Sequence, residues 1–165
     1  MTLTAERLRE VLNYDPGTGV FTWLVTLSNR AQAGVMAGLI SNGGCILIGI
    51  AGSKYQAHRL AWLYMTGEWP ESQIDHRDNS RGNNRWENLR LATPRQNNRN
   101  MKKRRDNTSG FKCVTRVQGS RKWRARIHLS GGREIHLGCF DTKEEAHAAY
   151  VDAAEAHFGE FARAG

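Results

Sequence analysis

The sequence predicts an α+β fold, in which short strands and helices alternate along 165 residues. Two observations predict it. Residues 74–97 contain a short strand, a polar loop, a returning extended segment and a helix start at Thr93-Pro94. In the last third, apolar and polar residues alternate with the period of two that is typical of half-buried strands, and a capped helix follows. We therefore divide the chain into residues 1–105, with a core motif at 54–105, a linker at 106–110, and residues 111–165.

The elements before residue 74 are short. Residues 3–12 form an amphipathic helix pattern with Thr4 as the N-cap, and a strand at 20–24 follows an Asp-Pro-Gly turn. A hairpin around residues 51–53 leads into a helix at 58–66 that Gly67 ends. His58, at the start of that helix, is predicted to be structural, with contact to a phosphate group as the alternative.

Four polar residues of the middle segment carry chemistry. His76 can accept a proton from water at pH 7 as a neutral imidazole. The Asp75 carboxylate and the Asn97 amide carbonyl are hard oxygen ligands suited to Mg²⁺ or Mn²⁺. Asn88 does not titrate, so its predicted role is to orient the histidine. Together they predict metal-assisted phosphodiester hydrolysis, whereas any one of them alone would be read as part of a solvated polar turn.

Three strands are predicted in the last third, at residues 112–117, 121–129 and 133–140. In the second of them, Lys122, Arg124, Arg126 and His128 alternate with Trp123, Ala125, Ile127 and Leu129, which gives one basic and one apolar face. Thr142 and Glu145 then stand in capping-box positions of a helix whose apolar stripe is Ala146, Ala149, Tyr150 and Ala153, and which Gly159 ends.

Positive charge is concentrated in one segment. Of the 24 lysines and arginines, thirteen fall between Arg95 and Arg133, where Asp106 is the only acid, so this segment carries +12 and the remainder −4. Such a segment predicts contact with a polyanion, and Lys102, Lys103, Arg104 and Arg105 are expected to touch phosphates. A membrane surface is not expected, because no basic amphipathic helix with a bulky apolar face accompanies the charge.

The three cysteines are odd in number, far apart and never paired as C-x-x-C, which disfavours a zinc site and a disulfide framework. The sequence contains no apolar run of membrane-spanning length and no signal-peptide pattern. We therefore expect an intracellular, cytoplasmic protein without a membrane partner, and we favour a monomer.

The segment IDHRDNSRGNNRWENLRLATPRQNNRN resembles the signature of the HNH endonucleases, the ββα-metal nucleases of phage and intron homing enzymes, and AHRLAWLYMTGEWP resembles the segment that precedes it there. The resemblance implies that Asp75 and Asn97 are metal ligands, that His76 is the general base and that Asn88 orients it. Asn97 stands where many members have histidine. This change replaces a nitrogen donor by an oxygen donor and favours Mg²⁺ or Mn²⁺ over zinc.

Residues 109–162, including KWRARIHL, IHLGCFDTKEEAHAAY and HFGEFA, resemble the AP2 DNA-binding domain, a small three-stranded antiparallel sheet packed on one helix. In that family the sheet reads the DNA major groove. The resemblance implies a groove-facing set of Thr115, Val117, Lys122, Arg124, Arg126, His128, Glu134 and His136. Cys113 occupies a position that is usually glycine in that family, a departure that is expected to shift the first strand slightly.

The two resemblances together predict a site-directed endonuclease of double-stranded DNA, of homing type and phage-encoded in a bacterial host. It would use one divalent metal ion, Mg²⁺ or Mn²⁺. The alternative is a sequence-specific DNA-binding regulator with a non-catalytic HNH unit. An RNA-binding protein is a weaker alternative, because the sheet lacks the aromatic side chains on which RNA bases stack.

Overall fold

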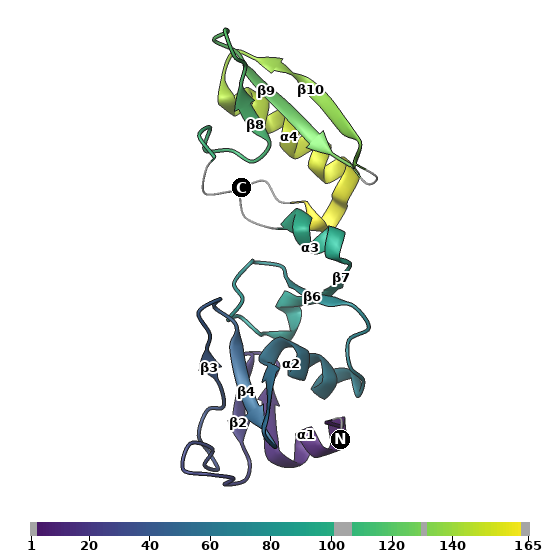
Figure 1. Cartoon of the computed structure of the whole chain (residues 1–165). Helices are drawn as coiled ribbons and strands as arrows, with labels where there is room; N and C mark the ends of the chain where they lie inside the picture. The colour runs from purple at the N-terminus through teal and green to yellow at the C-terminus, as the bar shows by residue number, and fades with distance from the viewer. Residues whose placement is uncertain (1–2, 101–106, 130–131, 163–165) are drawn as a thin grey trace. The chain divides into compact units, whose positions relative to one another are not determined.

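The computed structural model describes residues 3–100, 107–129 and 132–162, and the chain forms two compact units, Met1–Thr93 and Pro94–Gly165. Figure 1 shows the helices and strands of both. The first unit consists of α1 (Ala5–Val11), β1 (Leu12–Asp15), β2 (Val20–Trp23), β3 (Leu39–Ile40), β4 (Ile46–Ile50), β5 (Ser53–Gln56), α2 (Ala57–Thr66), β6 (Gln73–His76), the 3-10 helix η1 (Trp86–Asn88) and β7 (Leu89–Ala92). Its strands form three antiparallel sheets, β1-β2, β3-β4-β5 and β6-β7.

The first helix is confirmed with Thr4 as its N-cap, but it ends at Val11, and Leu12 begins a strand that the sequence analysis missed. Leu12 and Tyr14 are both buried, so the residue that completes the helical stripe is also the first of a period-two pattern. Pairing of β1 with β2, which places Leu12 opposite Trp23, decides between the two readings.

The predicted hairpin and the helix after it are confirmed. Ala51 and Gly52 both have positive φ, 49° and 79°, as a tight two-residue turn between β4 and β5 requires. Gly67 ends α2 in the left-handed conformation, and the helix buries its apolar face in the core of the unit. That core is formed by Leu8, Val11, Leu12, Phe21, Ile48, Leu60 and Leu63, which are all nearly inaccessible to solvent.

The segment that returns from the polar loop differs from the prediction of a continuous extended arm. Residues Trp86–Asn88 form the turn of η1, and only Leu89–Ala92 pairs with β6. Trp86 packs against Trp62 of α2, with 5.1 Å between the ring centroids, so tertiary packing favours the turn.

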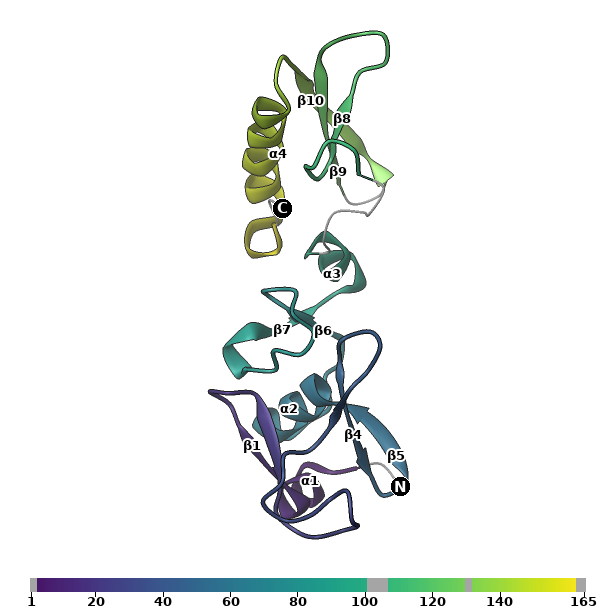
Figure 2. The ribbon, with the colours of Figure 1, turned by 90° about the vertical axis from the view of Figure 1, so that its left-hand side faces the viewer.

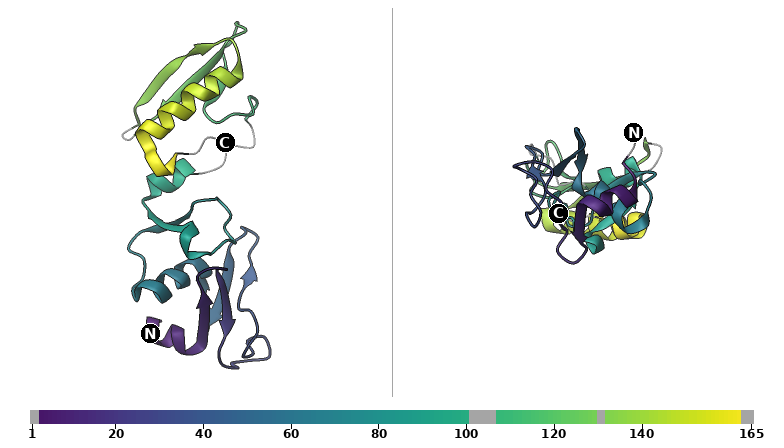
Figure 3. Two further views of the ribbon diagram at one scale, coloured as in Figure 1. Left: turned by 180° about the vertical axis from the view of Figure 1, so that it is seen from behind. Right: turned by 90° about the horizontal axis from the view of Figure 1, so that it is seen from below.

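The second unit consists of α3 (Pro94–Asn100), β8 (Val114–Arg116), β9 (Trp123–His128), β10 (Glu134–Phe140), α4 (Lys143–Phe158) and η3 (Gly159–Phe161). The strands form one antiparallel sheet in the order β10-β9-β8. Figures 2 and 3 show α4 lying along one face of this sheet, where Ala125, Ile127, Ala146 and Tyr150 are buried. The predicted capping box of Thr142 and Glu145 is present at the start of α4. Within the described residues, no helix is both long and apolar enough to cross a membrane.

Strand β10 does not keep a period of two. A bulge between His136 and Gly138 places Gly138 opposite Ala125 and Cys139 opposite Arg124. Cys139 therefore shares the face of the sheet with Arg124, opposite to α4, although simple alternation from His136 would place it on the other side. Cys113 has φ 60°, the left-handed conformation that glycine adopts most readily, which explains why glycine suits this position.

The predicted phosphate-binding residues Lys102, Lys103, Arg104 and Arg105, and the first residue of the predicted linker, Asp106, lie outside the described residues. Helix α3 belongs to the second unit, where it lies beside η3 (Figure 1).

Gly19 is predicted to be necessary for the first unit. Its φ is 75°, and an added Cβ would lie 2.4 Å from the backbone atoms of both Asn84 and Arg85. We expect Gly19→Ala to lower the free energy of unfolding by at least about 1–2 kcal/mol, the usual penalty of left-handed backbone for an L-residue, because the backbone contact adds to that penalty. Urea unfolding measures it. Gly17→Ala is the matched control, since its Cβ meets only the Asp15 side chain at 3.4 Å. Equal losses in both variants would contradict the steric argument.

Candidate active site on the β6-β7 hairpin

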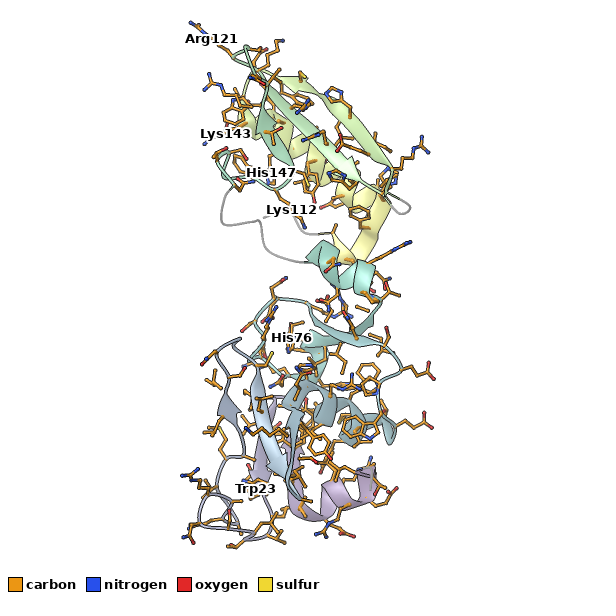
Figure 4. The ribbon with its side chains drawn as sticks, viewed as in Figure 1. Trp23, His76, Lys112, Arg121, Lys143 and His147 are labelled. Atoms are coloured by element: carbon orange, nitrogen blue, oxygen red, sulfur yellow. The ribbon has the colours of Figure 1, made fainter. Side chains whose placement is uncertain are left out.

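The candidate site lies on the two-stranded sheet of β6 and β7. Ile74 and Leu89 anchor the strands in the core of the first unit, and the register pairs Asp75 with Arg90 and His76 with Leu89. Asp75 and His76 are buried, at 4% and 6% exposure. Figure 4 labels His76 within the first unit. The strand–loop–strand arrangement predicted for these residues is therefore present, and it buries two ionisable side chains next to each other.

The imidazole of His76 is held in one orientation by Asn84. The amide nitrogen of Asn84 is directed at the Gly82 carbonyl oxygen, 3.5 Å away, and its Oδ1 lies 3.3 Å from Nε2 of His76. With the Asn84 amide in this orientation, Nε2 of His76 donates the hydrogen bond, because an amide oxygen only accepts. In the neutral ring the lone pair then lies on Nδ1, which is the atom that can accept a proton.

Burial lowers the pKa of His76, against the raising effects of its hydrogen bond to Asn84 and of the Asp78 and Asp75 carboxylates, and Arg81 lowers it further. Burial disfavours the charged imidazolium more strongly than the carboxylates favour it. The ring is consequently neutral at pH 7, as a general base must be.

Asn88 closes the loop between the two strands. Its Oδ1 accepts from the Asp78 N–H at 3.0 Å, and its Nδ2 donates to Asp78 Oδ1 at 2.9 Å and to the Asn83 carbonyl at 2.8 Å. These bonds act on the loop that carries Asn84. Asn88 therefore supports His76 through the loop, while Asn84 makes the hydrogen bond to the ring.

Asn84 is a residue that the sequence analysis missed. The loop contains Asn79, Asn83, Asn84 and Asn88, and residue type alone does not separate one amide from another. Contacts from outside the loop distinguish Asn84. The Tyr14 hydroxyl donates to the Asn84 carbonyl at 2.6 Å, and the Trp86 N–H donates to the Pro16 carbonyl at 3.0 Å. The β1-β2 hairpin thus fixes the backbone on which Asn84 stands.

Arg90 is the second residue that was missed. Its Nε and Nη2 both donate to Asp75 Oδ2, at 2.9 and 2.7 Å, and its side chain is 7% exposed. A short strand with one arginine gives no sequence signal of this contact, because the partner depends on the register of β6 with β7.

His58 lies against His76, with 5.0 Å between the ring centroids and an angle of 84° between the planes. It is buried, and its Nδ1 has no hydrogen-bond partner in the described part of the chain. Burial, and after it the proximity of His76, Arg59 and Arg81, lowers the pKa of His58 to about 4. His58 is therefore a neutral packing partner of the His76 ring at pH 7, in agreement with the structural role predicted for it.

A metal ion would have to be bound by few protein groups. The described residues contain no cluster of three His, Cys, Asp or Glu side chains that could hold one. The predicted ligands, Asp75 and Asn97, offer one carboxylate and one amide oxygen. This donor set fits a hard ion such as Mg²⁺ or Mn²⁺, which completes its coordination with water and phosphate oxygens. Asn97 lies on α3 in the second unit.

In the second unit, the sheet face opposite α4 carries most of the predicted groove-facing set. The register places Thr115 beside Arg124, His136 beside Arg126, and Glu134 beside His128. Glu134 accepts from Arg126 at 3.0 and 3.3 Å and lies 3.3 Å from His128 Nε2. Lys122, next to this face, lies 3.5 Å from Asp141. The face is therefore basic but contains one carboxylate that orients Arg126.

Comparison with known proteins gives one family and two relatives. A family profile described as HNH endonuclease matches residues 55–99. Protein 3.8 of Escherichia phage T7 is 34% identical over 107 residues, which cover 64% of this chain and 87% of the phage protein. An uncharacterized HNH endonuclease of Acanthamoeba polyphaga mimivirus is 35% identical over 111 residues, which cover 66% of this chain and 56% of the viral protein. No solved structure matches significantly.

His58 predicts a pH dependence of stability. Its pKa is about 4 in the folded chain and 6.5 when unperturbed, so folding disfavours the protonated form. The stability is therefore fully present above pH 6.5 and is lost as the pH falls toward 4, by up to about 3 kcal/mol. We expect His58→Leu to flatten the urea-unfolding profile between pH 4 and 7 relative to wild type, whereas His157→Leu, at an exposed position of α4, leaves it unchanged. His76, whose pKa burial also lowers, contributes to the profile of both proteins, so a pH dependence in His58→Leu as large as that of wild type would contradict this assignment.

Proposed function

Because the chain belongs to the HNH endonuclease family, we propose that it is a metal-dependent nuclease that hydrolyses phosphodiester bonds of double-stranded DNA at chosen sites. The single observation that carries this proposal is the neutral, buried His76 held by Asn84 in the tautomer that presents Nδ1 as a base. The family profile covers this histidine, and the mimivirus relative, described as an HNH endonuclease, supports the nuclease class.

In the proposed reaction, His76 takes a proton from the attacking water through Nδ1 as the water oxygen approaches the scissile phosphorus. The bond from phosphorus to the 3′ oxygen breaks and that oxygen takes a proton from solvent water, so the products carry 5′-phosphate and 3′-hydroxyl ends. Asp75 and Asn97 are the proposed ligands of Mg²⁺ or Mn²⁺. When bound, the ion would stabilise the negative charge that develops on the phosphate and the leaving oxygen.

The supporting side chains preserve this geometry. Asn84 fixes the ring tautomer, His58 packs against the edge of the ring, and Asn88 closes the loop that carries Asn84. The Asp78 carboxylate is engaged by Asn83, Asn88 and the Ser80 N–H, and these bonds lower its pKa although burial opposes them. We therefore assign Asp78 to the loop and not to the metal.

We propose that the second unit recognises the target sequence, as an AP2-like sheet that reads the DNA major groove. One basic sheet face with α4 on the other side supports this role, because a sheet face of suitable width can enter that groove. The Arg126 guanidinium, oriented by Glu134, and the Arg124 side chain beside it would contact base edges. A nuclease that recognises one target sequence in this way would be suited to a homing role.

A DNA-binding regulator with an inactive HNH unit is the alternative function. Nicking of a supercoiled plasmid separates the two: cleavage in Mg²⁺ or Mn²⁺ that EDTA abolishes supports the enzyme, and specific binding without cleavage supports the regulator.

The His76→Ala variant tests the base. We expect it to cleave at least about 10²-fold more slowly than wild type in Mg²⁺, the usual contribution of a positioned proton acceptor, while binding duplex DNA with unchanged affinity. Single-turnover nicking and a gel-shift titration measure the two quantities. His157→Ala is the control, and nicking by His76→Ala at the wild-type rate would overturn the assignment.

The Arg124→Ala variant tests whether the sheet of the second unit recognises the target sequence. If Arg124 reads a base edge, its loss should relax discrimination at one position of the site by about 1–3 kcal/mol, the value of a bidentate contact. Sequencing the cleavage positions on a pool of random duplexes measures this preference. Arg116→Ala is the matched control, because Arg116 pairs with Trp123 on the other face of the same sheet. An unchanged cleavage map in Arg124→Ala would remove the residue from the readout.

A further inference from the structure

Arg90 and Asp75 form a charge pair inside the site. They face each other across β6 and β7, both side chains are at least nine-tenths buried, and two N–H groups of Arg90 converge on one carboxylate oxygen, Oδ2. Two bonds on one oxygen fix the position of Oδ2 and place a positive charge directly on the carboxylate.

A buried ion pair of this kind is a poor device for stability. Removing two charges from water costs about as much as their attraction returns, and apolar residues of similar size often serve a core equally well. The pair does make it possible to bury the carboxylate before any metal arrives, because an unpaired buried carboxylate would be strongly unfavourable. Its position beside His76 therefore calls for a functional explanation.

Charged groups of both signs already surround His76. Asp75 is paired with Arg90, and Asp78 and Arg81 are a further carboxylate and guanidinium that act on the His76 ring. A divalent cation bound by Asp75 would meet the Arg90 guanidinium on the same carboxylate. In a buried site this repulsion is screened less than in water. The negative charge of a DNA phosphate would offset it.

We propose, on the basis of the function proposed above, that Arg90 is a positioning residue that couples metal binding to DNA binding. It orients Asp75 and keeps the metal affinity of the free protein low, so that the ion is retained only when a phosphate joins the site. By linkage, the metal tightens DNA binding by the same factor by which DNA tightens metal binding. Metal and substrate therefore assemble together, and the free enzyme holds little metal.

The test measures Mn²⁺ binding by electron paramagnetic resonance of the free ion. In the absence of DNA, we expect Arg90→Met to bind Mn²⁺ about tenfold or more tightly than wild type, because the competing cation is removed. Arg90→Lys keeps the charge and loses the fork, so its Mn²⁺ affinity should stay near that of wild type while its cleavage rate falls. Arg85→Met, at an exposed arginine of the same loop, should match wild type. Asp75→Asn with Arg90→Met should lose the added affinity.

The coupling is measured with a duplex present. His76→Ala, which is expected to cut the duplex far more slowly than wild type, serves as the background, and Asp75→Asn protein corrects for Mn²⁺ bound by the DNA itself. Duplex should tighten Mn²⁺ binding about tenfold or more when Arg90 is present and less when it is methionine, and Mn²⁺ should tighten duplex binding by the same factor.

The outcomes separate the two proposals. Equal Mn²⁺ affinity of Arg90→Met and wild type, or an equal increase in Arg85→Met, overturns the role of Arg90 even if wild type nicks DNA with metal. If Arg90→Met folds only when Mn²⁺ is added, the ion replaces the guanidinium and the proposal is supported. If Arg90→Met does not fold at all, the His76→Ala protein, which retains Arg90, provides the test. In that protein, a duplex-induced increase in Mn²⁺ affinity below about twofold overturns the coupling. If wild type does not nick DNA in the presence of metal, the proposed nuclease function is overturned instead.

Discussion

The burial of polar groups is the constraint on which the site depends. The described polar side chains that the first unit buries are His58, Asp75, His76, Asn84, Asn88 and Arg90, and they all belong to the β6-β7 hairpin, its loop or the helix beside it. A buried polar group must find a partner within the protein or be left at a cost. Arg90 meets this need for Asp75, Asn84 for His76, and the loop for Asn88. The same bonds that make burial possible also hold the His76 ring and the Asp75 carboxylate in place, so stability and the geometry of the candidate site share their contacts.

A two-stranded sheet with four residues in each strand cannot hold such a site alone. The remainder of the first unit supplies the support. The Tyr14 hydroxyl and the Pro16 carbonyl bind the loop at Asn84 and Trp86, and Gly19 comes so close that no side chain fits there. Trp62 of α2 packs against Trp86, and His58 of the same helix packs against His76. The N-terminal residues are thus part of the site's construction.

The two faces of the sheet in the second unit have different environments. Its sheet has one apolar face, and α4 covers this face with small side chains such as Ala146 and Ala154 that allow close approach. The opposite face keeps its arginines and histidines in contact with solvent or with Glu134. The bulge in β10 changes which residues share that face. Cys139 lies on it with its Sγ 3.6 Å from Nε2 of His136. Local irregularity, and not composition, decides the pattern that a ligand would meet.

The sequence by itself determined the elements whose signals are local. The Thr4 cap, the Thr142–Glu145 capping box, the Gly67 helix end and the alternation in β9 depend on neighbours a few residues away, and each is present as predicted. The sequence also grouped Asp75, His76, Asn88 and Asn97 by their types and spacing, which are local too, and their shared catalytic role stays a prediction. Only the tertiary structure decided what depends on register and long-range contact: the strand at Leu12, the turn at Trp86, the bulge in β10, the pairing of Arg90 with Asp75 and the choice of Asn84 to hold His76. A one-residue shift between β6 and β7 would give Asp75 another partner, and no pattern within either strand reports that shift.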